Sequence, residues 1–202
     1  MTALVARRPH ARARGPEAQL LALAQQGDVT AFETLTRSCI DRLFAVVVRL
    51  VDDPAEAEDV VQEALLRAWR GIGRFRGKSA FFTWLYRIAI NEAHRSLEKG
   101  ARRPQTVDPA DARVQESPSN DLGPARLAED RELRGTLGLA LSALPPPHRA
   151  AVILRDVEGL STREAADAAG IGEAAFKSRL HQGRLGLRAA LGDEFLIAAG
   201  SA

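Results

Sequence analysis

Residues 71–103 read GIGRFRGKSAFFTWLYRIAINEAHRSLEKGARR, and this stretch decides how the rest of the chain is interpreted. From Ser79 onward, apolar residues recur every three or four positions, which predicts a helix with one buried stripe. Ser79 is the expected N-cap, because its hydroxyl can accept a hydrogen bond from an amide of the first turn. The stripe consists of Phe82, Leu85, Tyr86, Ala89, Ala93 and Leu97.

A second line on the same helix is aromatic, cationic and amide-bearing, and it consists of Trp84, Arg87, Asn91 and Arg95. Basic residues interleaved with aromatic ones suit single-stranded nucleic acid, because cations contact phosphates and flat rings stack on unpaired bases. The alternative is an ordinary solvated row of arginines with Trp84 in the core. These residues alone leave both interpretations open.

Composition places the chain among helical proteins. It has 202 residues, a formal net charge of +2 and only 5% aromatic residues, and few segments resemble strands. The single cysteine, Cys39, excludes a disulfide framework and a multi-cysteine metal site. No apolar run is long enough to span a bilayer and the N-terminus lacks the apolar segment of a signal peptide, so we expect a cytoplasmic protein.

The N-terminal half begins with a basic segment, 1–16, which we expect to be a disordered tail. A short helix at 17–26 is followed by one long core helix from Asp28 to residue 51, with Cys39 buried inside it. Asp53 and Pro54 then start another helix, as an N-cap and a first helical residue.

That helix carries an acidic and amide-bearing patch formed by Asp59, Gln62 and Glu63. These residues lie too far from the helix start to be explained by the helix dipole alone. The patch would suit a basic protein partner. An ordinary solvated face is the alternative.

Residues 104–128 are rich in proline and acidic residues, which predicts a flexible linker. Helices at 126–144 and 147–157 follow, separated by the prolines at 145–147. Ser161 and Glu164 form a capping-box pattern, and Gly170 separates this short helix from a longer one. Two helices joined by a glycine turn predict a helix-turn-helix, although a packed hairpin that never meets DNA has the same pattern. The second helix presents the residue types that read a major groove: Lys177, Ser178, Arg179, His181, Gln182, Arg184 and Arg188.

Catalytic motifs are lacking. The four histidines at 10, 94, 148 and 181 do not have metal-ligand spacing, and neither a phosphate-binding glycine loop nor a nucleophile motif is present. We therefore expect no enzyme activity, no cofactor and no metal site.

The strings DVVQEA at 59–64 and FFTWLYRIAIN at 81–91, with LSALPPPHRAAVILRDVEGLSTREAADAAG at 141–170, resemble the extracytoplasmic-function (ECF) group of sigma-70 family factors. These are dissociable subunits that give bacterial RNA polymerase its promoter specificity. The resemblance covers about 32–103 and 139–191, the family's regions two and four. It implies an all-α fold of two small helical domains, 17–103 and 129–192, joined by the linker 104–128 and followed by a tail, 193–202.

The resemblance also assigns roles to residues. It places Asp59, Gln62 and Glu63 on the helix that docks on the clamp coiled coil of the polymerase largest subunit, which favours a partner surface. Residues 78–95 match the element that recognises the minus-ten promoter sequence, and Asn91 lies where a base flipped from the non-template strand is received. The expected minus-ten set is Lys78, Trp84, Arg87, Asn91, His94, Arg95, Arg102 and Arg103. The expected minus-thirty-five set is Lys177, Ser178, Arg179, His181, Gln182 and Arg184.

The implied partners are core RNA polymerase, through its clamp coiled coil and flap region, promoter DNA, and an anti-sigma factor. The chain departs from the family pattern at Gln182, where arginine is common, and at 174–176, where Ala-Ala-Phe replaces Gly-Thr-Val. Because glutamine pairs with adenine and arginine with guanine, we expect an altered minus-thirty-five preference. The alternative function is a stand-alone helix-turn-helix regulator. Such a protein usually dimerises, and no sustained heptad is visible.

Overall fold

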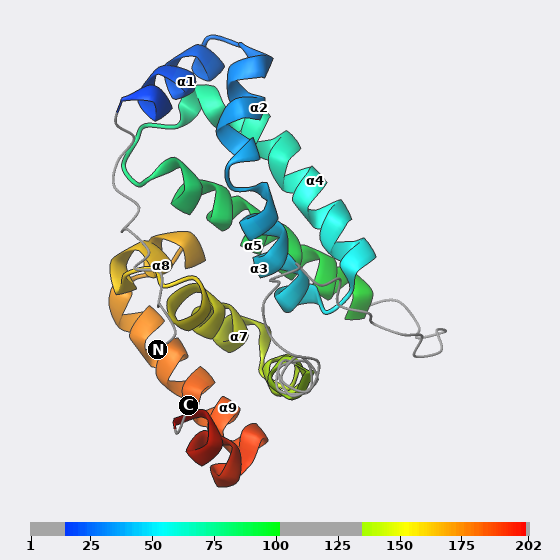
Figure 1. Cartoon of the computed structure of the whole chain (residues 1–202). Helices are drawn as coiled ribbons and strands as arrows, with labels where there is room; N and C mark the ends of the chain where they lie inside the picture. Colours follow the sequence, from blue (N-terminus) through cyan, green and yellow to red (C-terminus); the bar gives the residue numbers. More distant parts are fainter. Residues whose placement is uncertain (1–14, 102–134, 201–202) are drawn as a thin grey trace, which may run out of the picture.

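In the computed structural model, which describes residues 15–101 and 135–200, regular structure is entirely helical and no strand occurs among these residues (Figure 1). The N-terminal domain consists of α1 (Pro16–Gln25), α2 (Val29–Arg37), α3 (Ile40–Val51), α4 (Pro54–Gly71), a short 3-10 turn η1 (Ile72–Arg74) and α5 (Phe81–Ala101). The all-α prediction is confirmed. The linker 104–128 and most of the tail 1–16 lie outside the described residues.

Local chemistry sets where these helices begin. Asp28 accepts a hydrogen bond from the amide of Ala31 at 3.0 Å, and Asp53 caps α4 with Pro54 as its first residue, as predicted. The single helix predicted from Asp28 to residue 51 is wrong, because the chain breaks at Cys39 between α2 and α3. Hydroxyl and thiol groups at 36, 38 and 39 bond back to carbonyls of α2, which competes with helix propagation.

The start of α5 differs from the prediction by one residue. Ala80, not Ser79, gives its carbonyl to the first turn, accepting from the amide of Trp84 at 3.2 Å. The buried stripe is confirmed, because Leu85, Tyr86 and Ala89 are fully buried. The stripe packs on α3 and α4. The side of α5 that carries Trp84 and Asn91 is not part of this stripe.

The C-terminal domain contains a helical segment at 135–142, α7 (Pro146–Val152), a π-helical turn η2 (Ile153–Val157), α8 (Thr162–Ala169) and α9 (Glu173–Gly200). The predicted helix at 147–157 therefore widens into a π-turn after Val152. The capping box is present in both directions between Ser161 and Glu164. Gly170 forms the turn with φ 69°, a conformation that favours glycine. The helix pair α8 and α9 is the predicted helix-turn-helix.

Helix α9 passes close to α7 at Gly183. A Cβ atom there would lie 2.7 Å from Val152 Cγ2 and 2.8 Å from the carbonyl oxygen of His148. At Gly186, a Cβ would meet only the end of the Leu144 side chain, at 2.6 Å. The contact of Gly183 with the His148 carbonyl therefore fixes how closely α9 approaches α7.

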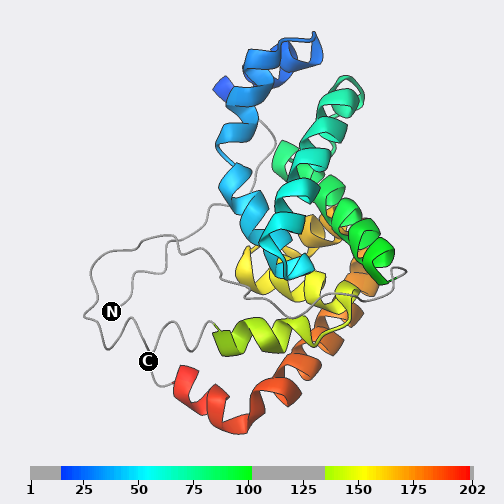
Figure 2. The ribbon, with the colours of Figure 1, turned by 90° about the vertical axis from the view of Figure 1, so that its right-hand side faces the viewer.

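The two domains pack against each other, α5 on α8 and α3 on α7 (Figures 1 and 2). Glu158, only 4% exposed, accepts hydrogen bonds from the Tyr86 hydroxyl at 2.5 Å and from Arg42 Nη2 at 2.9 Å. Arg149, 6% exposed, donates to the Leu50 carbonyl at 2.9 Å and to Asp52 Oδ2 at 2.5 Å. Burial, followed by the neighbouring carboxylate of Glu158, raises the pKa of Tyr86, which keeps the phenol a donor.

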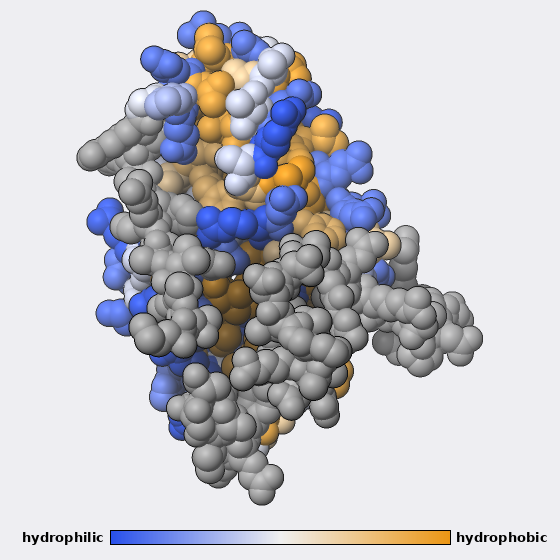
Figure 3. Space-filling model, viewed as in Figure 1, coloured by the Kyte–Doolittle hydropathy of each residue, from blue (hydrophilic) through white to orange (hydrophobic). Residues whose placement is uncertain are grey.

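The surface is mixed. Figure 3 shows apolar side chains among polar ones over the end of the molecule that carries α1 and α2, where Leu23 and Val29 are exposed. Gln25 of α1 donates to the Phe75 carbonyl at 2.8 Å and so fixes the start of the loop before α5. Across the residues that the structure describes, none of the helices has the length and apolarity needed to cross a membrane.

Candidate nucleic-acid interface

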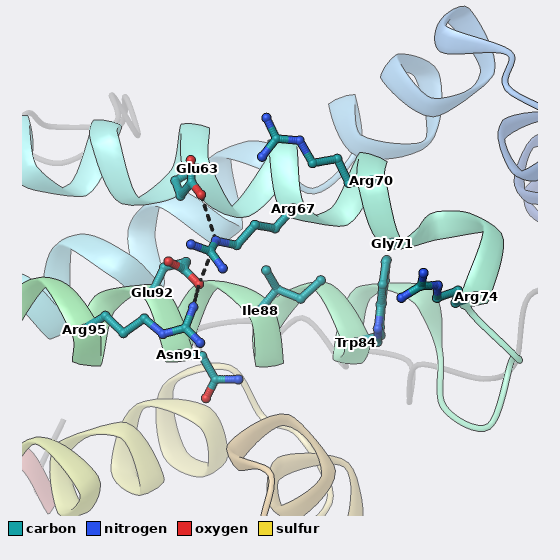
Figure 4. Close-up of a pocket in the computed structure, with 10 residues that line it drawn as sticks. All are labelled: Glu63, Arg67, Arg70, Gly71, Arg74, Trp84, Ile88, Asn91, Glu92 and Arg95. Atoms are coloured by element: carbon teal, nitrogen blue, oxygen red, sulfur yellow. Dashed lines mark hydrogen bonds and ion pairs between the residues drawn. The ribbon is translucent and has the colours of Figure 1, made fainter.

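An open hollow of about 530 Å³ lies between the C-terminal half of α4 and the outer face of α5 (Figure 4). Its floor is the packed seam between the two helices. It is lined by Glu63, Arg67, Arg70, Gly71, Arg74, Trp84, Ile88, Asn91, Glu92 and Arg95. Four arginines against two glutamates make it electropositive.

Three of those arginines come from the C-terminal part of α4 and from η1, which follows it. Arg67, Arg70 and Arg74 are spaced three and four residues apart, so they lie on one side of the chain. Arg67 is paired with carboxylates, whereas Arg70 and Arg74 form no ion pair with any described residue. These two guanidinium groups are available for phosphate oxygens.

Trp84 packs in an aromatic cluster and also lines the hollow. Its ring packs 5.0 Å from the Phe75 ring and 5.8 Å from the Phe81 ring, measured between centroids. It also lies against Gly71, where a Cβ would be 3.4 Å from Trp84 Cζ2. The indole is only half-buried and lines the hollow, as Figure 4 shows. The aromatic cluster therefore holds a rigid ring at the edge of a basic depression.

Asn91 is exposed on α5, and Figure 4 draws its amide on the side that faces the C-terminal domain. No hydrogen bond joins this amide to another described residue. Its donor and its acceptor are therefore both available to a ligand.

Glu92 lies one residue further along α5 and is buried, with 8% of its side chain exposed. Its Oε1 atom accepts from Arg95 Nη1 at 2.6 Å and lies 3.1 Å from Arg67 Nε. Arg67 Nε is also 2.8 Å from Glu63 Oε1. A chain of alternating charges thus crosses the hollow from α4 to α5 (Figure 4).

The other residues expected at the minus-ten element lie apart from the hollow. Lys78 is exposed on the loop before α5. The guanidinium of Arg87 lies against Gly170, where a Cβ would be 3.3 Å from Arg87 Nε. His94 lies between the domains, where burial and then the charge of Arg179 lower its pKa. The expected sites at 102 and 103 are outside the described residues.

The residues expected at the minus-thirty-five element divide into two groups. Lys177, Ser178, His181 and Gln182 are exposed on the N-terminal half of α9. Arg179 is half-buried beside His94. Arg184 donates to Asp156 at 2.9 and 2.5 Å, and these hydrogen bonds raise the pKa of Arg184. Arg184 therefore braces α9 on the π-turn.

The acidic patch predicted on α4 borders the same hollow. Asp59 and Gln62 are exposed, and Glu63 reaches the rim through Arg67. Leu66, 44% exposed, continues this side of α4 at helical spacing and adds an apolar contact point.

Sequence reasoning alone did not include Arg67, Arg70, Arg74 or Glu92 in the expected site. The spacing of the three arginines across α4 and η1 was a usable signal for a basic face. Nothing in the sequence indicated that Glu92 would be buried, because that depends on how α4 packs on α5.

Comparisons with known proteins identify both halves of the chain. The family model for Sigma-70 region 2 matches residues 35–103, and the model for Sigma-70, region 4 matches residues 134–187. The RNA polymerase sigma-H factor of Pseudomonas aeruginosa is 36% identical over 178 residues, covering 86% of this chain and 92% of its own. The ECF RNA polymerase sigma-E factor of Escherichia coli K12 is 38% identical over 152 residues, 73% of this chain and 79% of its own.

Solved structures show the same fold. CnrH, in complex with the cytosolic domain of CnrY, matches with a TM-score of 0.62 and 25% identity, covering 88% of this chain and 97% of its own. The sigma factor RpoE of Bartonella quintana, in complex with the anti-sigma factor NepR, matches with a TM-score of 0.62 and 24% identity, covering 81% and 98%. The similarity to RpoE shows a shared fold and nothing further.

Proposed function

The chain belongs to the ECF group of the sigma-70 family, and we propose that it melts promoter DNA by capturing non-template bases at the hollow between α4 and α5. The observation that carries this proposal is that one depression brings together a rigid indole with an amide and guanidinium groups that have no partner among the described residues: Trp84, Asn91, Arg70 and Arg74. A volume of about 530 Å³ is within the range of sites that hold small organic ligands.

These groups can offset the free-energy cost of extruding a base from the duplex. Extruding a base from a duplex costs a few kcal/mol, and stacking on an aromatic ring returns about 1–3 kcal/mol. Asn91 would recognise the Watson–Crick edge with its donor and acceptor, while the arginines contact the backbone. Arg87 and Lys78 would hold the flanking strand.

Core polymerase would bind the acidic patch of α4, which borders the hollow. We propose that Asp59, Gln62 and Glu63, with Leu66, contact the clamp coiled coil of the largest subunit. Electrostatic complementarity of this kind sets specificity and association rate more than affinity. Region four would contact the flap region while it holds upstream DNA.

Reading both promoter elements requires the two domains to separate. Elements at minus ten and minus thirty-five are divided by roughly 85 Å of duplex, at about 3.4 Å per base pair. In the structure, α5 and α8 are in contact. A chain as long as 102–134 can extend to roughly 110 Å, which covers that distance. The docked arrangement is therefore the state before promoter binding.

A protein partner of the anti-sigma type could hold that docked state. CnrH, which shares this fold, was solved with the cytosolic domain of CnrY bound. We propose a partner that covers regions two and four together.

At the upstream element, Lys177, Ser178, His181 and Gln182 would read the major groove. Gln182 would pair with adenine. Selection from promoters randomised at minus thirty-five tests this assignment. Gln182→Arg should shift one position toward guanine, and an unchanged preference at every position would contradict it.

The main test measures co-elution with core RNA polymerase and then promoter opening. Reversal of Asp59 and Glu63 to arginine should weaken polymerase binding, whereas reversal of Glu33, which is exposed on α2, should leave it unchanged. Asn91→Ala should bind polymerase normally and open promoters poorly. A wild-type chain that binds duplex DNA alone and ignores polymerase would instead be a stand-alone regulator.

A further inference from the structure

Glu92 is an unusual residue to find beside a surface for DNA. Its side chain is 8% exposed, although it carries a charge and lines a basic hollow. Both guanidinium groups that reach it bond to the same oxygen, Arg67 from α4 at 3.1 Å and Arg95 from α5 at 2.6 Å. Those two arginines are themselves about half exposed, 43% and 55%.

Stability alone does not explain this carboxylate. Ion pairs with half-exposed arginines contribute little to stability, and burying the carboxylate costs more than such pairs return. An apolar residue in this place would pack between α4 and α5 without that cost. The two arginines that Glu92 holds, however, both line the hollow, so the benefit of the carboxylate lies in how they are presented.

We propose that Glu92 is a positioning residue that makes binding in the hollow depend on base sequence. This inference rests on the proposed function of the hollow. By fixing Arg67 and Arg95 and neutralising part of their charge, Glu92 limits the phosphate attraction that any sequence would receive. The oriented guanidinium groups then place the strand so that Asn91 and Trp84 meet the base, because phosphate contacts set register while base contacts set sequence preference.

Glu63 does not perform the same task. Its side chain is 41% exposed and it bonds only Arg67 among the described arginines. It also belongs to the patch proposed for polymerase. Among the carboxylates that the structure describes, Glu92 alone bonds an arginine from each of the two helices that form the hollow.

The experiment compares Glu92→Gln with Glu98→Gln, each bound to core RNA polymerase. Both changes remove one negative charge from α5 without changing side-chain size, and Glu98 is exposed and outside the hollow. The probes are short single strands: the sequence that the wild-type complex enriches from a randomised pool, and a scramble of the same composition. Dissociation constants are measured at several salt concentrations.

For Glu92→Gln we expect the ratio of scrambled to enriched dissociation constants to fall about tenfold, the scale of one good base contact. Binding of the scramble should tighten, and its salt dependence should steepen by about 0.7 in log–log slope, as for one added phosphate contact to a single strand. Glu98→Gln should keep the wild-type ratio. Equal ratios for the two variants would overturn the role of Glu92.

Two further measurements show whether a changed ratio comes from unfolding of the variant. Thermal unfolding of each variant separates repositioning from loss of fold. If Glu92→Gln unfolds, Arg95→Gln serves instead, because it removes the Glu92–Arg95 bond from its exposed side. This variant should also lower the ratio of scrambled to enriched dissociation constants. A wild-type ratio in Arg95→Gln would overturn the proposal. If the wild-type complex enriches no sequence at all, the proposed function of the hollow fails, which is a different result.

Discussion

Glu158 offers the sharpest test of the docked arrangement. We expect Glu158→Ala to release the C-terminal domain from the N-terminal one while leaving each domain folded. The carboxylate lies at the end of the π-turn, is 4% exposed, and is the acceptor that the Tyr86 hydroxyl and Arg42 share across the interface. No other described contact replaces this acceptor for Tyr86.

The magnitude follows from what the substitution leaves behind. The Tyr86 hydroxyl, on a side chain with no exposed surface, would lose its acceptor, which costs about 1–3 kcal/mol. The side chain of Arg42 is 36% exposed, so water can replace its lost partner, and removing the Arg42–Glu158 ion pair costs about 1 kcal/mol. A total of about 2–4 kcal/mol would increase the open population roughly 30- to 700-fold, at about 1.4 kcal/mol per factor of ten.

Hydrogen exchange of the full chain measures this directly, because amides of α5 and α8 at the contact exchange through domain opening. Asp156→Ala is the matched control. It removes an acid two residues earlier, on the same turn, whose partner Arg184 is in the same domain. If Glu158→Ala and Asp156→Ala exchange alike at α5, the docking reasoning is refuted.

Gly183→Ala should destabilise the protein by about 1–3 kcal/mol in thermal unfolding despite a better helix propensity, because the new methyl meets a carbonyl of α7, whereas Gly186→Ala meets a movable side-chain end and should cost less. Cys39, whose pKa burial raises to about 12, should resist thiol reagents at neutral pH until the protein is denatured, and rapid labelling of native protein would contradict this. Because docking lowers the pKa of His94 below 6.5, the undocked state binds more protons on acidification. The opening constant at α5, which is the exchange rate divided by the intrinsic amide rate at the same pH, should therefore rise as pH falls below 6.5, and His94→Gln should remove that rise.

Local signals in the sequence predicted most of the fold. The stripe through Leu85 and Ala89, the cap at Asp53 and the turn at Gly170 all depend on residues a few positions apart, and each is found as expected. The errors are local too. Thiol and hydroxyl side chains around Cys39 broke a helix whose apolar periodicity continued through the break.

The docking of the domains could not be predicted in this way. Its central bonds join Tyr86 to Glu158 across 72 positions and Arg42 to Glu158 across 116. No spacing rule relates residues so far apart. Nothing in the sequence around Glu158 distinguishes it from a glutamate on the surface. The helical spacing of Trp84 and Asn91 indicated a candidate binding face. The burial of Glu92 between arginines from two helices could not be predicted, because it depends on contacts between distant residues.

We propose that a non-template base enters the hollow when the chain is bound to polymerase. The most direct measurement is 2-aminopurine fluorescence, with the probe placed in turn at each position of the non-template minus-ten strand. We predict that emission rises at one position in the wild-type complex, and that Asn91→Ala loses this rise while still binding polymerase. A rise of equal size in the Asn91→Ala complex, or none at any position in a wild-type complex that opens the promoter, would contradict the claim.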